Sequence, residues 1–147
     1  MFSAAKLLEA TGEPSMAQET EEWTHLQYFV SQPTPTILLN AAGFDSDRMA
    51  ELARAAQSIS RPVVAVVPEG EQDISQFVDA VWPIKGKVRE CFLPLVASIP
   101  GELLAAERAA MLGTAYFRNF EGGRTVPWSK EGASRIRDSH MIDEVLR

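Results

Sequence analysis

Two pairs of ionisable residues near the N-terminus have types and spacings that chemistry could use. Glu22 and His25 are three residues apart, and so are Lys6 and Glu9. The first pair has the E-x-x-H spacing of carboxylate-bridged metal sites, but those sites use two copies of the motif and this sequence has one. The second pair has the spacing of a helical ion pair, which contributes only about 0.2–0.5 kcal/mol. We therefore expect no metal at either pair.

Motifs of the common enzyme classes do not occur. The sequence has no P-loop, no G-x-G-x-x-G, no C-x-x-C, no H-E-x-x-H and no G-x-S-x-G. A Ser-His-Asp site could use His25, but no serine stands out as its nucleophile. Cys91 is the only cysteine, so one chain can form neither a disulfide nor a cysteine-based metal site. No cofactor is expected.

Length and composition set the class of protein. The 147 residues, 46% hydrophobic and 23% charged, fit one domain covering 1–147. A net charge of −6 gives no basic field for a nucleic acid, although local groups can still bind a small anion. No apolar run reaches the roughly 18 residues of a membrane span, and the N-terminus lacks an apolar signal segment. We expect a soluble, cytoplasmic protein with no nucleic acid or membrane partner.

Hydrophobic periodicity predicts helices that alternate with short strands. The first expected helix covers 3–10 and is stopped by Gly12, and the second covers about 14–25. A third covers 47–58, capped by Asp45 or Ser46, and a short helical turn follows at 73–77. The apolar segment 88–113 should be kinked or restarted at Pro100, and its second part should be a helix buried nearly all round. The expected strands are 36–39, buried on both faces, then 62–67 and 78–83. Two buried strands joined by one helix form a βαβ unit with parallel strands. The chain thus divides into N-terminal helices (1–25), an α/β core (35–113) and a C-terminal arm (114–147).

Three stretches carry a resemblance to a known family. Lys6-x-x-Glu9 followed by Glu22-x-x-His25 resembles the opening of the second half of tandem sugar isomerase (SIS) proteins such as glucosamine-6-phosphate synthase. Residues 94–105 are similar to that family's P-x-x-x-x-[IV]-P-x-x-L-L-A entry to its last core helix. The likeness covers residues 3–113. It implies a three-layer α/β/α sandwich with a mainly parallel central sheet and flavodoxin-like topology.

The resemblance also implies roles for individual residues. In isomerase relatives a histidine opens the sugar ring, a glutamate moves a proton between C1 and C2, and a lysine steadies the oxyanion. These would be His25, Glu9 and Lys6, with Glu22 binding substrate. A lysine from the family's C-terminal arm also reaches the site. Its counterpart here would be Arg135, Arg118 or Lys130, and an arginine would keep anion binding but donate protons poorly.

Two functions follow from the resemblance. The Ser/Thr-rich phosphate loop of the family belongs to its first half, and residues 40–45 do not supply one. The first expectation is therefore a half-site of an aldose–ketose isomerase or fructosamine-6-phosphate deglycase, completed by a homodimer or a partner half. The alternative is a non-catalytic sugar-phosphate-binding or structural half. Plainer readings stay open, with His25 an interface histidine and Lys6–Glu9 a surface ion pair.

Overall fold

A computed structural model describes residues 1–31, 34–40, 45–115 and 118. Its centre is a parallel sheet of three strands, β1 (Thr36–Leu39), β2 (Val63–Pro68) and β3 (Ala80–Ile84), in the order β1-β2-β3. Thr36 pairs with Val63 in one ladder, and Val64 pairs with Ala80 in the other. The mixed α/β class, the three strands and their parallel direction are confirmed.

Burial differs between the central strand and its neighbour. In β2, Val63 and three consecutive residues, Ala65, Val66 and Val67, are buried, as expected of a strand covered on both faces. In β1, burial alternates: Leu38 is buried, whereas Ile37 and Leu39 are partly exposed. The expectation that residues 36–39 are buried on both faces is therefore wrong. An edge strand can keep one face uncovered, and here the helix on that face packs on β2 and β3.

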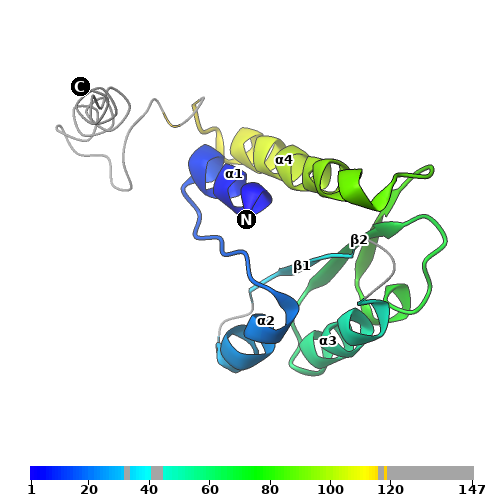
Figure 1. The fold of residues 1–147 in the computed structure, drawn as a ribbon. Coiled ribbons are helices and arrows are strands. Elements are labelled where there is room, and N and C mark those ends of the chain that lie inside the picture. Colours follow the sequence, from blue (N-terminus) through cyan, green and yellow to red (C-terminus); the bar gives the residue numbers. More distant parts are fainter. Residues whose placement is uncertain (32–33, 41–44, 116–117, 119–147) are drawn as a thin grey trace, which may run out of the picture.

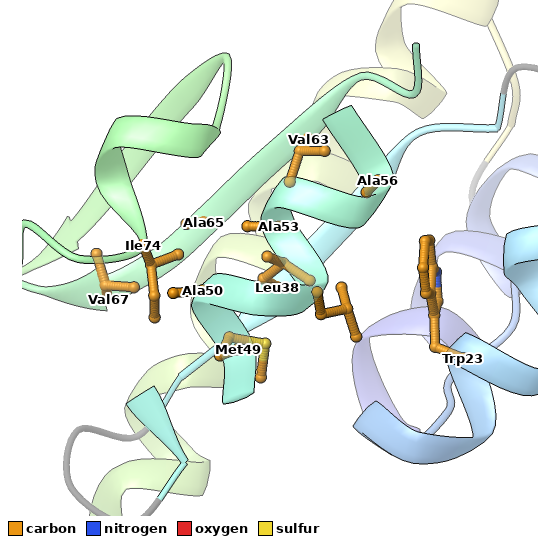
Figure 2. Packing of buried hydrophobic residues seen from close by; sticks show 11 residues of the cluster. Trp23, Leu38, Met49, Ala50, Ala53, Ala56, Val63, Ala65, Val67 and Ile74 are labelled. Carbon is orange, nitrogen blue, oxygen red and sulfur yellow. The ribbon is translucent and has the colours of Figure 1, made fainter. Parts of the chain in front are cut away.

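Helix α3 (Ser46–Ser58) covers one face of the sheet. Its buried residues share helical spacing and meet the side chains of Leu38, Val63, Ala65 and Val67, together with Ile74 from the turn before η2 (Ser75–Phe77) (Figure 2). The alanines of α3 let its backbone approach the strands closely. The buried residues of the helix are Met49, Ala50, Leu52, Ala53 and Ala56.

Helix α4 (Leu93–Leu112) packs on the other face of the sheet, and helix α1 (Phe2–Thr11) packs against α4 (Figure 1). Leu93 and Ala97 of α4 form a second cluster with Val66 of β2 and Ile84 of β3. α1 ends where predicted, because Gly12 takes the left-handed conformation (φ 75°) and its amide bonds to the carbonyl of Leu8. None of the helices in the described part of the chain combines the length and apolar character that crossing a bilayer requires.

The second expected helix is shorter than predicted. α2 spans Thr20–Leu26 and continues into the 3-10 turn η1 (Gln27–Phe29), whereas residues 12–19 form no regular element. The Ser15 hydroxyl donates to the carbonyl of Ala4, and Glu13 pairs with Arg108. These bonds tie residues 13–15 to α1 and α4, and tertiary contacts of this kind override a favourable N-terminal helix signal such as Pro14.

The burial of α4 also departs from expectation. The helix runs through Pro100 without a restart, and only Leu93, Ala97, Gly101 and Ala105 are buried. These residues recur every fourth position and so lie on one side of the helix. The prediction of a helix buried nearly all round is wrong, because the apolar residues on the other side of α4 are exposed.

Candidate functional site

Lys6 and Glu9 meet on α1. The Lys6 ammonium lies 2.6 Å from a Glu9 carboxylate oxygen, and the two side chains are 35% and 44% exposed. The same ammonium lies 5.4 Å from the centre of the Phe2 ring. A lysine and a carboxylate at this exposure hold each other weakly, since such pairs contribute about 0–1 kcal/mol. A ligand with a stronger anion could therefore displace Glu9 from Lys6.

Arg118 reaches the C-terminal end of the same helix. A Cβ added at Gly12 would lie 2.7 Å from Cζ of Arg118, so the guanidinium rests directly against the Gly12 backbone. The carbonyl groups at a helix C-terminus favour a cation there. Of the predicted site residues, Lys6 and Glu9 thus pair on α1, and Arg118 lies just beyond its C-terminal end.

The remaining described site residues lie elsewhere. Glu22 and His25 are exposed on α2, and His25 occupies its last turn. α2 packs beside α3, whereas α1 packs against α4, and the two helices stand apart in Figure 1. The structure therefore brings Lys6 and Glu9 together but does not bring His25 to them. Arg135 and Lys130 lie outside the described residues.

Arg48 of α3 forms ion pairs with Glu21 of α2 and with Glu51 of its own helix. Its Nε and Nη2 donate to the two carboxylate oxygens of Glu21 at 2.6 and 2.8 Å, and its Nη1 donates to Glu51 at 2.7 Å. The hydrogen bonds from Arg48 hold the pKa of Glu21 below its usual value, and the positive charges of Arg48 and His25 add to this effect. Glu21 thus links α2 to α3 through its ion pair with Arg48. Glu22 and His25 are exposed to solvent on the same helix.

Arg108 of α4, which was not predicted from the sequence, pairs with the segment that follows α1. The Arg108 guanidinium bonds to both carboxylate oxygens of Glu13, directly after Gly12, and the hydrogen bond holds the pKa of Glu13 below its usual value. Helical spacing alone puts Arg108 on the same side of α4 as Gly101 and Ala105, and the structure shows that this side faces α1. A charged residue at such a position needs a partner.

The described residues offer no sign of metal chemistry. No three His, Cys, Asp or Glu side chains within 1–31, 34–40, 45–115 and 118 gather into a group that could hold a metal ion. Cys91 is exposed beside the start of α4. The arrangement on α1 places an ammonium and a carboxylate side by side, both accessible to solvent.

Comparison of the chain with known protein families, with curated proteins and with solved structures found no match. The described residues define a mixed α/β fold whose sheet has three parallel strands.

Proposed function

We propose that this chain is an SIS-like phosphosugar-binding half-domain whose site is completed by a second copy or by a partner half. The observation that carries the proposal is the Lys6–Glu9 pair on α1, with Arg118 against Gly12 at the C-terminal end of the same helix. An ammonium beside a carboxylate suits a ligand that has both an anionic group and hydroxyl groups, and the guanidinium at the helix end adds a second cation.

The fold gives further support. Three parallel strands in sequential order match one end of a flavodoxin-like 2-1-3-4-5 sheet. α3 packs on one face of these strands, and α4 packs on the other. A three-layer α/β/α sandwich is the architecture we infer for the complete domain, in a reducing cytoplasmic compartment.

The proposed roles follow from the chemistry of each group. Lys6 would exchange Glu9 for a phosphate, because a phosphate monoester carries a charge of about −1.5 to −2 and the exposed pair with a single carboxylate charge is weak. Arg118, at the C-terminal end of α1, would add a second anion-binding group but would not donate a proton, because a guanidinium stays charged. Glu9, once released by Lys6, would accept a hydrogen bond from a sugar hydroxyl or take a proton from the carbon beside the carbonyl.

Catalysis would need more than one chain. His25 and Glu22 lie on α2, away from Glu9 on α1, so the acid–base set that the resemblance implies is divided within the chain. This separation favours a second candidate function, a sugar-phosphate-binding half that regulates or scaffolds a partner enzyme without turnover of its own.

A turnover assay distinguishes the two functions. The chain would be incubated with hexose 6-phosphates and with fructosamine 6-phosphate, and aldose–ketose interconversion and amine release would be followed. For an isomerase or deglycase, Glu9→Gln combined with His25→Ala abolishes turnover while circular dichroism stays unchanged. Activity retained by that double variant would sink the enzyme assignment. Ligand binding without turnover by the wild-type chain supports the second candidate.

A further inference from the structure

The solvent side of α4 carries an apolar strip along nearly its whole length. Leu95 is 69% exposed and Leu103 is 60% exposed, and Phe92 and Ile99 are each about half exposed. Two exposed alanines extend the strip toward the helix C-terminus. We call this set the α4 stripe; its residues are Phe92, Leu95, Ile99, Leu103, Ala106 and Ala110.

Helical geometry places the stripe opposite the packed side of α4. At about 100° per residue, its members from Leu95 to Ala110 fall within a sector roughly 80° wide, and Phe92 directly precedes the helix. That sector is centred about 180° from the buried residues Leu93, Ala97, Gly101 and Ala105. Glu102 and Glu107 flank the stripe on its two sides, and both are exposed. The stripe therefore points directly away from α1 and the sheet.

The sizes of the side chains change along the stripe. Its N-terminal half has the large residues Phe92, Leu95 and Ile99, and its C-terminal half ends in Ala106 and Ala110. A second α4 running antiparallel over the first would bring Phe92 and Leu95 of each copy to the alanine end of the other, while Ile99 and Leu103 meet at the centre. Large residues facing small ones at both ends allow the helices to pack closely.

We propose that the α4 stripe is the contact surface between two copies of this chain, which pair antiparallel about a two-fold axis. In this register Phe92 of each copy faces the partner's Ala110, and Ile99 of each copy faces the partner's Leu103. The same patch serves both copies, as a two-fold interface requires.

The exposed area is sufficient for such a pair. An aromatic side chain buries roughly 150–250 Å², and each of the four large members, partly exposed and mostly aliphatic, offers on the order of 100 Å². With the alanines and the flanking side chains, each copy buries on the order of 500–600 Å², and the pair exceeds the roughly 1,000 Å² expected of a specific interface. The glutamates beside the stripe make a lipid surface a poor occupant, because helices that lie on membranes carry lysine and arginine there.

This inference does not rest on the phosphosugar proposal. It depends on the exposure and spacing of residues on α4, and none of the α1 residues proposed to bind ligand belongs to the stripe. Either proposal can fail while the other stands.

The experiment is sedimentation equilibrium on the full chain. The wild-type chain should have twice the monomer mass of 16.2 kDa at micromolar concentrations. Leu103→Glu should raise the dimer dissociation constant by at least about 30-fold, as expected at the centre of an interface. Met111→Glu is the matched control, because Met111 is 77% exposed on another side of the same helix, and its dimer should match the wild type.

A second variant separates specific pairing from general stickiness. Ala110→Phe adds apolar area, which would strengthen non-specific association, but in the proposed register it collides with the partner's Phe92 and should weaken the dimer. A monomeric wild type at 100 μM, as an approximate upper concentration, would overturn the proposal. So would a dimer that survives Leu103→Glu or tightens with Ala110→Phe. Circular dichroism checks the fold, and Leu95→Glu replaces Leu103→Glu if that variant loses helix.

Discussion

The guanidinium carbon of Arg61 lies 5.6 Å from the centre of the Trp23 ring. Arg61 is only 4% exposed, and its guanidinium also donates to the backbone carbonyls of Gln27, Val30 and Thr34. Its Nε is buried and has no hydrogen-bond partner among the described atoms. A single side chain beside β2 thus fastens α2, η1 and the segment before β1 to the sheet.

Arg61→Met should lower the free energy of unfolding by about 2–4 kcal/mol, because three carbonyl groups lose a charged donor. Arg61→Lys should recover only part of the loss, since an ammonium cannot reproduce the planar fork. Denaturant titration measures both changes. The matched control is Arg54→Met: Arg54 is exposed and lies 4.7 Å from the Phe77 ring, so it tests a cation–π contact alone, worth about 0.5–1 kcal/mol. Equal losses at Arg61 and Arg54 would refute the role given to the carbonyl bonds.

Gly101→Ala should destabilise the protein although alanine is the better helix former. A Cβ added at Gly101 would lie 2.3 Å from Cβ of Ser3, so α1 and α4 would have to move apart. Overpacking of this kind costs about 1–3 kcal/mol, which exceeds the gain of up to about 1 kcal/mol in helix propensity.

Ser3→Gly supplies the control for that contact. It removes the Ser3 side chain, so the double variant Ser3→Gly with Gly101→Ala should be more stable than the sum of the two single changes predicts. Thermal unfolding of the four proteins measures the coupling. Strict additivity would mean that the helices do not meet at these residues.

The Glu13–Arg108 and Glu21–Arg48 pairs should make stability depend on acid pH. Hydrogen bonds from the arginines lower the pKa of both glutamates in the folded protein. Each pair therefore stabilises the protein above the unfolded pKa of about 4.3, and this stabilisation disappears as pH falls through the lower folded pKa.

The measurement is the free energy of unfolding between about pH 5 and pH 3. Glu13→Gln and Glu21→Gln should each reduce its slope against pH, and Arg108→Gln should reduce the slope as much as Glu13→Gln does. A slope that stays at the wild-type value after Glu13→Gln would contradict the assigned ion pair. Because the side chains of Glu13 and Glu21 are 38% and 64% exposed, the effect should also weaken with added salt.

Local sequence signals were enough to predict the parallel core. Short β-branched runs bounded by Pro62 and by Pro35 predicted the first two strands, and Gly12 predicted the end of α1. These features depend on neighbouring residues along the chain. The Lys6–Glu9 pair was predictable for the same reason, since helical spacing alone places the two side chains together.

The features that the sequence did not predict depend on contacts between distant segments. The local sequence predicted helix at residues 14–19, but these residues form no helix in the structure, where Ser15 bonds to α1 and Glu13 to α4. The apolar content of α4 predicted burial, but the chain as described covers only one side of that helix. The placement of Arg118 against Gly12, 106 positions earlier, required the α1–α4 contact and could not be derived from spacing.

Calorimetric titration with hexose 6-phosphates tests the central claim, ligand binding at α1, most directly. The panel would contain glucose, fructose and glucosamine 6-phosphates, with inorganic phosphate and the unphosphorylated sugars as controls. We predict saturable binding of at least one sugar phosphate, weakened roughly 10- to 100-fold by Lys6→Gln or Arg118→Gln, as expected when a charged hydrogen bond is lost. Lys85→Gln, an exposed lysine beyond β3, should leave affinity unchanged. Absence of binding to every sugar phosphate, or binding that Lys6→Gln and Lys85→Gln affect equally, would contradict the account.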